Sequence, residues 1–395
     1  MDIELRRPEP DDLPAYFDLR AQAFAAPGSE RDGWLAEAKV ENMLGAYEHG
    51  RLVGALTAEP WGQWYGGRCL SMGGLAGVVV AAEARGAGVA ARLLARVLEE
   101  MRERGTAVSS LHPATLRPYR RAGWEVAGDF GWYRVPTRSL ARLHHGEPER
   151  IVRIDRDGWS RVQLCYERAA PEHPGWMHRT DARWEWHARL RFADQSFVYG
   201  VEGDDGDLAG YVAWSQSRSG ELWGHGIQVH DFVSLTPEAH ATLWSLLGAQ
   251  SMQVESVLVP SAVIDPLLVR LAEQDLVEAG NNRWMHRLVD VVGALEGRGW
   301  PEGVAAEVHL QVADPVAPWN DGRHVLRVEG GHARATPGGT GDVQIGIGGL
   351  SALAGGSWSA RTLATAGALH HADPETLATL DAIFASPRPT LLDDF

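Results

Sequence analysis

The sequence predicts a chain of several domains, α/β in its first two parts and α+β in its last. Its 395 residues exceed the size at which a single hydrophobic core stops growing, which is about 250–300 residues, so two or three domains are expected. Short apolar strands alternate with amphipathic helices at the start, and the same order returns after residue 150. In the last hundred residues strands come first and helices follow.

The first segment, residues 1–143, has the strand and helix order of an α/β unit. A helix begins near Pro10, where Asp11 and Asp12 suit the positive end of its dipole. Strands are predicted at Leu52–Leu56 and Val78–Val80 from their branched apolar residues. A helix over Ala90–Arg104 carries these residues on one apolar face: Leu93, Leu94, Val97, Leu98 and Met101.

The second segment, residues 144–284, follows a polar stretch at His144–Pro148 whose glycine and proline are typical of a linker. Its order of elements resembles that of the first segment, so we expect a second, degenerate copy of the same fold. The expected elements are a strand at Ile151–Ile154, a helix at Asp181–Leu190, strands at Phe197–Gly200 and Leu208–Trp214, and a helix at Pro237–Gln250.

The third segment, residues 285–395, is predicted to be a small α+β lid or carrier domain. Strands are expected at Val304–Val312 and Val325–Val328, followed by helices from Leu350 and at Pro374–Ala385. The final stretch, Pro387–Phe395, is stiffened by two prolines and ends on an aromatic residue, which favours an anchored terminus over a frayed one.

Charge and composition exclude several classes of partner. The formal net charge is 37 − 52 = −15, so nucleic acid and anionic membrane are poor partners and a cationic ligand is favoured. No stretch approaches the roughly 20 apolar residues of a membrane span, and the N-terminus lacks an apolar core, so we expect a cytoplasmic protein.

Cys69 and Cys165 are expected to be buried small hydrophobes. The pairs His144–His145 and His370–His371 have no further ligand at metal spacing, so no metal is predicted.

The most informative motif joins the Val78–Val80 strand to the following helix through Gly86 and Gly88. Free backbone N–H groups converge at the positive end of that helix, and such a nest binds phosphate. Arg85 can add a charge-assisted hydrogen bond, and a glycine lets the backbone approach an anion. The three glycines of a dinucleotide-binding loop and the Gly-Lys-Ser/Thr of a P-loop are both missing.

The pattern Arg-x-x-Gly-x-Ala at Arg85–Ala90 resembles the pyrophosphate loop of the GCN5-related N-acetyltransferases (GNAT), with Ala82 in place of the family's usual proline. The resemblance implies that the loop holds acetyl-CoA; the alternative is an ordinary glycine-containing turn. The implied acetyl-CoA-binding residues are Val78, Val79, Val80, Arg85, Gly86, Ala87, Gly88, Val89, Ala90, Ala91, Ala114 and Thr115.

A second family motif, Tyr-x-x-x-Gly-aromatic, matches Tyr119–Trp124. In the family its tyrosine points at the CoA sulfur. Departure of the thiolate is easier when a proton is delivered to it, so Tyr119 is the implied catalytic acid. The alternative is a half-buried aromatic residue at the end of a helix.

The whole chain resembles the enhanced intracellular survival (Eis) acetyltransferases of actinobacteria, with specific similarity at residues 288–299, 359–364 and 380–385. That resemblance implies two tandem GNAT-like domains, a sterol-carrier-like C-terminal domain, a homohexamer, and acetylation of aminoglycosides. It also implies that the terminal carboxylate of Phe395 is the catalytic base. An α-carboxylate has a pKa of about 3.3–3.7, so it is ionised and can accept a proton from an ammonium.

The acceptor is the least determined part of this prediction. Trp34 in the loop region after the first helix, and Asp394 beside Phe395, are the expected substrate-binding residues. The stretch Phe24–Gly28 lacks the acidic residue found in the family's substrate loop. The alternatives are therefore a lysine side chain or a biosynthetic amine as acceptor, or a non-catalytic ligand-binding protein. Trp184 and Trp186 are candidates for an aromatic channel, although core packing is the commoner role.

Overall fold

The computed structural model describes residues 2–143, 150–218 and 225–395, so the linker predicted at 144–148 lies outside the described residues. Contacts divide the chain into two compact units. The first comprises the chain to Ala127, Trp284–Arg388 and Phe395; the second comprises Gly128–Arg283 and Pro389–Asp394. The three-part division at residues 143/144 and 284/285 stays a prediction.

The first unit contains a mixed sheet in the strand order β1-β2-β3-β4-β5-β13, in which only the β4–β5 pair is parallel. Its strands are β1 (Glu4–Arg6), β2 (Met43–Glu48), β3 (Arg51–Tyr65), β4 (Arg68–Val80), β5 (Val108–Leu111) and β13 (Val277–Leu288), and its helices are α1 (Leu13–Phe24), α2 (Arg31–Glu37), α3 (Val89–Glu103) and α4 (Arg117–Arg121).

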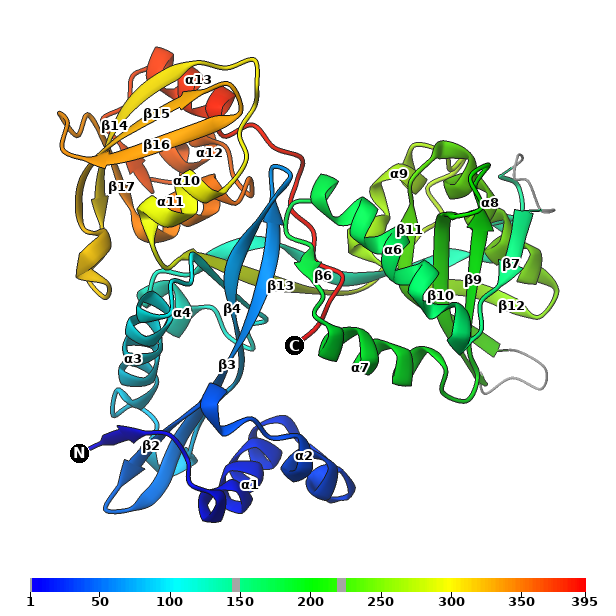
Figure 1. Ribbon diagram of the computed structural model, residues 1–395, viewed down its shortest axis with the longest axis horizontal. Coiled ribbons are helices and arrows are strands. Elements are labelled where there is room, and N and C mark those ends of the chain that lie inside the picture. Colours follow the sequence, from blue (N-terminus) through cyan, green and yellow to red (C-terminus); the bar gives the residue numbers. More distant parts are fainter. Residues whose placement is uncertain (1, 144–149, 219–224) are drawn as a thin grey trace. The chain divides into compact units, whose positions relative to one another are not determined.

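Helices α1 and α3 cover opposite faces of this sheet. Met43 and Leu44 are neighbours on β2 and therefore point to opposite faces. Met43 packs with Tyr16 of α1, whereas Leu44 belongs to the cluster formed with α3. All five residues of the predicted apolar face of α3 are buried, which confirms that prediction; the helix begins one residue earlier than expected. Figure 1 shows α3 beside strands β3 and β4.

The first unit also contains a separate five-stranded sheet in the order β16-β15-β14-β17-β18. The pair β14–β17 is parallel, and the other pairs are antiparallel. The strands are β14 (Ala306–Ala313), β15 (Gly322–Glu329), β16 (His332–Pro337), β17 (Val343–Gly346) and β18 (Leu369–His370), and the helices are α10 (Val291–Gly297), α11 (Ile347–Ala354), α12 (Ala360–Thr365) and α13 (Pro374–Ile383). The α+β character predicted for this region is confirmed.

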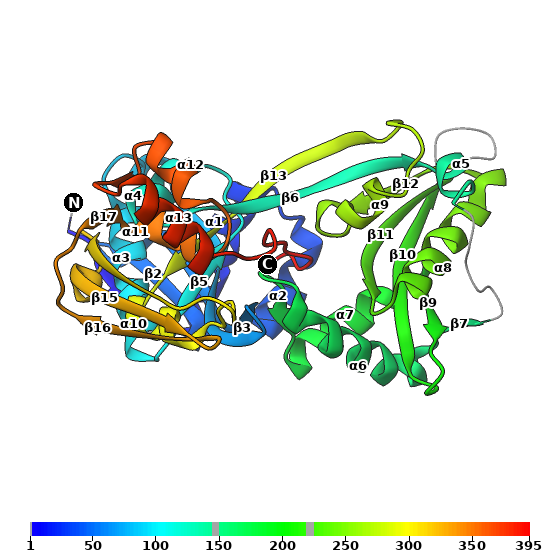
Figure 2. The ribbon, with the colours of Figure 1, turned by 90° about the horizontal axis from the view of Figure 1, so that it is seen from above.

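The second unit repeats the arrangement of the first, with strand order β6-β12-β11-β10-β9-β7. The parallel pair is β11–β12, and helix α8 connects its two strands as α3 connects β4 and β5. Figure 2 shows α6 and α7 on one face of this sheet and α8 on the other. The elements are β6 (Glu125–Pro136), α5 (Thr137–Leu140), β7 (Ile151–Arg153), α6 (Trp159–Ala169), β8 (Met177–His178), α7 (Asp181–Arg191), β9 (Ser196–Glu202), β10 (Leu208–Arg218), β11 (His225–Ser234), α8 (Pro237–Gly248), β12 (Val254–Pro260) and α9 (Asp265–Leu268).

The two copies exchange a strand along the chain. The antiparallel neighbour of β5 in the first unit is β13, which follows the second copy in sequence. The antiparallel neighbour of β12 in the second unit is β6, which follows the first copy. Both strands carry the chain across the boundary between the units.

One prediction about the cysteines is wrong. Cys165 is buried as expected, but Cys69 is exposed. Cys69 lies near the start of β4, opposite Trp64, where successive side chains alternate between the two faces. Its neighbour Leu70 takes the buried face, so Cys69 points outward.

Candidate active site

The first feature of the candidate site is the free end of β4. Strand β5 pairs with β4 only between Met72 and Leu75, where it ends at Leu111, while β4 continues to Val80. Gly77 adopts a φ of +58°, and the register with β3 shifts there, so the strand is bulged. The backbone of Val78–Val80 therefore extends past the end of β5 and presents polar groups along that edge.

The second feature is the turn from β4 into α3. Gly86 and Gly88 have φ values of +83° and +80°, which glycine adopts readily and other residues do not. Gly88 is the N-cap of α3, so the N–H groups of the first helical turn lie just beyond it. A Cβ built at either glycine meets no protein atom within 4 Å, so the space above this backbone is open.

A cavity of about 310 Å³ lies at this turn. It is lined by Val80, Ala84, Arg85, Gly86, Gly88, Val89, Ala90, Ala91, Pro118 and Arg121. Two arginines, Arg85 and Arg121, are among these lining residues, and the Arg85 Nε donates a hydrogen bond of 3.4 Å to the Val80 carbonyl oxygen. Positive charge, a helix N-terminus and an open glycine backbone are the components of a diphosphate site. These residues fit the diphosphate of acetyl-CoA.

Seven of the predicted acetyl-CoA-binding residues line this cavity: Val80, Arg85, Gly86, Gly88, Val89, Ala90 and Ala91. Val78, Val79 and Ala87 belong to the same strand and turn but are not among its lining residues. Ala114 and Thr115 lie exposed in the loop between β5 and α4. Sequence reasoning missed Pro118 and Arg121, although both flank the Tyr119 that it had identified.

Tyr119 lies on α4 and is 8% exposed, within the core cluster that includes Leu94 of α3. Burial raises the pKa of its hydroxyl to about 12. The tyrosine is therefore protonated at neutral pH, which is the state that a proton donor requires.

Phe395 belongs to the first unit by its contacts. Its ring packs edge-on against Trp61 of β3, with centroids 4.8 Å apart, and against His112, with centroids 5.0 Å apart. His112 follows directly after β5, so the terminal residue lies at the strand end where β4 and β5 part. The sequence predicted an anchored terminus but did not identify His112 as its contact.

The two predicted substrate-binding residues belong to different units. Trp34, on α2, stacks on Tyr16 of α1 at 6.2 Å between ring centroids and is only partly buried. Asp394, in the second unit, has a side chain 71% exposed and is bound by the Arg183 guanidinium through its backbone oxygen and its carboxylate.

The two candidate channel tryptophans have different roles. Trp184 is 2% exposed and packs edge-on against Trp159 and Tyr166, so it is a core residue. Trp186 lines a cavity in the second unit, which is described below.

Within the described residues, no group of three or more His, Cys, Asp or Glu side chains could hold a metal ion. In the same part of the chain, no helix has both the length and the hydropathy needed to cross a membrane.

Comparisons with known proteins agree with this geometry. Family models described as acetyltransferase (GNAT) domains match residues 4–127 and 175–288, and a sterol carrier protein domain model matches residues 291–392. The chain is 28% identical to the N-acetyltransferase Eis of Mycobacterium tuberculosis and 27% identical to an uncharacterised N-acetyltransferase of Streptomyces griseus, with 98% of each chain covered in both cases.

Solved structures give the same result. A GCN5-related N-acetyltransferase from Anabaena variabilis superimposes with a TM-score of 0.92 at 30% identity, and 100% of both chains is covered. The chain therefore belongs to the GCN5-related N-acetyltransferases, as an Eis-type member with two GNAT domains and a C-terminal sterol carrier domain.

Proposed function

We propose that this N-acetyltransferase uses acetyl-CoA to acetylate amines of a small polycationic acceptor of the aminoglycoside class. The observation that carries the proposal is the cavity at Arg85–Ala91, which adjoins the free end of β4 in the same unit as Tyr119 and Phe395. The net charge of −15 favours a cationic acceptor over a neutral one.

Acetyl-CoA, when bound, supplies an activated acetyl thioester to this site. The loop at Arg85–Gly88 and the N-terminus of α3 hold its diphosphate. The backbone N–H groups along Val78–Val80 polarise the carbonyl that the amine attacks, because they are preorganised donors on a strand edge.

Two groups of the chain carry the proton transfers. The carboxylate of Phe395 accepts a proton from the acceptor ammonium, and packing of its ring against Trp61 and His112 fixes its position. Tyr119, protonated because burial raises its pKa to about 12, donates a proton to the departing thiolate. In this proposal the amine attacks directly, without an acetylated enzyme intermediate.

The test separates the carboxylate of Phe395 from its ring. One glycine added after Phe395 keeps the ring and displaces the carboxylate, while Phe395→Leu keeps the carboxylate at the same position of the chain. CoA release is measured with a thiol reagent, using kanamycin, a lysine peptide and spermidine as acceptors.

We expect the added glycine to lower kcat on kanamycin by about 10²-fold or more, the usual contribution of a general base, and Phe395→Leu to lower it far less. Equal turnover of the glycine-extended and original chains would exclude the carboxylate as base. Turnover of the lysine peptide alone would replace the aminoglycoside class with a protein acceptor. Absence of CoA release with every acceptor, together with absence of CoA binding, would favour a non-catalytic ligand-binding protein.

The homohexamer stays a prediction, and measurement of the molar mass by light scattering tests it.

A further inference from the structure

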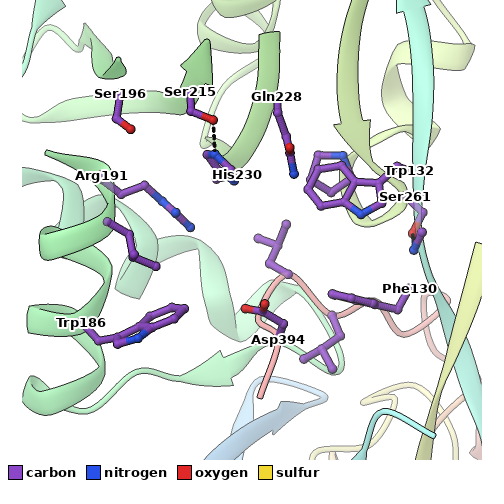
Figure 3. Close-up of a pocket in the computed structure, with 15 residues that line it drawn as sticks. Phe130, Trp132, Trp186, Arg191, Ser196, Ser215, Gln228, His230, Ser261 and Asp394 are labelled. Atoms are coloured by element: carbon purple, nitrogen blue, oxygen red, sulfur yellow. Dashed lines mark hydrogen bonds between the residues drawn. The ribbon is translucent and has the colours of Figure 1, made fainter. Parts of the chain in front are cut away.

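A cavity of the second unit, shown in Figure 3, has a volume of about 430 Å³, and it shares no lining residue with the cavity at Arg85–Ala91. Such a volume is typical of sites for small organic ligands. Three aromatic residues, Phe130, Trp132 and Trp186, line it. The polar part of the lining includes Arg191, Ser215, His230 and Asp394.

Arg191, the last residue of α7, is the unusual member of this lining. It is 92% buried, since only 8% of its surface is exposed, and Figure 3 shows its guanidinium pointing into the cavity. Among the described residues it forms no ion pair with a carboxylate, and its Nε is buried without a hydrogen-bond partner. A buried charge without a partner is strongly unfavourable, so such a group normally pairs with an anion.

The neighbouring carboxylates are already engaged by other arginines. Arg179 pairs with Asp231 at 2.8 Å and with Asp393 at 3.1 Å, and all three side chains are almost fully buried. Arg183 pairs with Asp393 at 3.5 Å. Arg179 and Arg183 are therefore paired with carboxylates at close range, whereas Arg191 forms no such ion pair among the described residues.

A histidine holds Arg191 in place. Burial lowers the pKa of His187 to about 4, so its ring is neutral at neutral pH. The His187 Nε2 lies 2.7 Å from the Asp393 carboxylate and must donate to it, because an ionised carboxylate only accepts. Its Nδ1 then accepts a hydrogen bond from the Arg191 Nη2 at 3.4 Å. This contact orients the guanidinium and uses only one of its five N–H groups.

We propose that this cavity binds a small organic monocarboxylate with a flat apolar body, whose carboxylate pairs with Arg191 and whose body packs against Trp132 and Trp186. The carboxylate would supply the partner that Arg191 lacks. Asp394 also lines the cavity, so a dicarboxylate would meet a like charge there. Asp394 is also the residue predicted above to bind the cationic acceptor, but the positive charge of Arg191 disfavours a cation beside its guanidinium, so the ligand proposed here differs in charge from that acceptor.

The polar wall supports the same ligand class. His230 and Ser215 are joined by a hydrogen bond of 2.8 Å, drawn as a dashed line in Figure 3. Burial lowers the pKa of His230 to about 4, and the nearby Arg191 contributes, so this ring is also neutral. It can therefore act as a neutral hydrogen-bonding group and does not provide a second positive charge.

The experiment compares an aromatic acid with its neutral amide. Indole-3-acetate and indole-3-acetamide are titrated into the full chain by calorimetry, without acetyl-CoA or an amine. We expect the acid to bind at one site per chain and at least tenfold more tightly than the amide. Arg191→Gln should lower the affinity for the acid to that for the amide. Arg189 is an exposed arginine on the same helix, so Arg189→Gln should leave both affinities unchanged.

A stability measurement separates a binding role for Arg191 from a structural one. Because Arg191 is buried without an ion-pair partner, Arg191→Met should leave the melting temperature unchanged or raise it. A clearly lowered melting temperature would show that Arg191 stabilises the fold and would overturn the proposal. Equal binding of acid and amide, absence of binding of either at millimolar concentration, or an unchanged affinity of Arg191→Gln would also overturn it. None of these results depends on whether acetyl transfer to an aminoglycoside occurs.

Discussion

Replacement of Gly88 by alanine should separate the conformational role of this glycine from its role in binding. Gly88 caps α3 with φ +80° and ψ +10°, a left-handed conformation that is unfavourable for an L-residue by about 1–2 kcal/mol. The added Cβ meets no protein atom within 4 Å, so we expect no further steric loss of stability. A drop of a few degrees in melting temperature should follow, because 1 kcal/mol corresponds to about 2–4 °C in a large domain.

Gly88→Ala should reduce the affinity for CoA more than it reduces the stability of the fold. The same Cβ would project into the open cavity above the turn, where the backbone has to approach the diphosphate. Loss of one hydrogen bond to a charged group is worth about 1.5–3 kcal/mol, which corresponds to a roughly 10- to 100-fold weaker Kd.

Gly105 provides a matched control at the other end of the same helix. It has φ +72°, and a Cβ built there also meets no atom within 4 Å, but it lies outside the cavity. Gly105→Ala should therefore lose a similar amount of stability and keep its affinity for CoA. Calorimetric titration with CoA and thermal denaturation of both variants provide the two readouts. If Gly88→Ala and Gly105→Ala bind CoA equally well, the assignment of this turn to the diphosphate is refuted.

Two further predictions concern buried titratable groups. Tyr119→Phe should lower kcat by about 10²-fold with little change in the KM for acetyl-CoA, since it removes only a proton donor. Because burial raises the pKa of Tyr119 to about 12, the wild-type rate should show no loss from tyrosine ionisation up to about pH 10. A change in KM without a change in kcat would contradict the assigned role of Tyr119. His286 is 1% exposed, and its Nδ1 lies 3.2 Å from the Tyr65 hydroxyl. Its pKa is lowered to about 3 by burial, so the unfolded chain binds a proton below pH of about 6.5 that the folded chain does not. The neutral His286 ring therefore costs no stability above that pH, and as the pH falls the free energy of unfolding decreases because of this group, by about 2–3 kcal/mol between pH 7 and 4.5. Urea denaturation at both pH values should show that His286→Gln reduces this loss, and an identical pH dependence in wild type and variant would contradict the argument.

The strand, turn and helix around Arg85–Ala90 could be predicted because their signals are local. Gly86 and Gly88 permit the positive φ values that the turn adopts, and the apolar spacing from Leu93 to Met101 predicts the buried face of α3, all within about 20 residues of chain. The same reasoning failed for Cys69, because alternation along a strand shows that two faces exist but not which face is covered.

The strand exchange could not be predicted from periodicity. Nothing in the spacing of residues 277–288 indicates that β13 lies beside β5, since strand pairing depends on contacts between segments far apart in sequence. The same limit applies to the packing of Phe395 on His112, which are separated by more than 280 residues.

The sequence by itself determined the strand, turn and helix of the loop and the order of the elements, because backbone conformation and helix amphipathicity are properties of neighbouring residues. Only the tertiary structure decided which strand completes each sheet, what Phe395 contacts, and that Arg191 is buried without a carboxylate. Burial and charge pairing depend on what surrounds a side chain in space, and one sequence position alone does not contain that information.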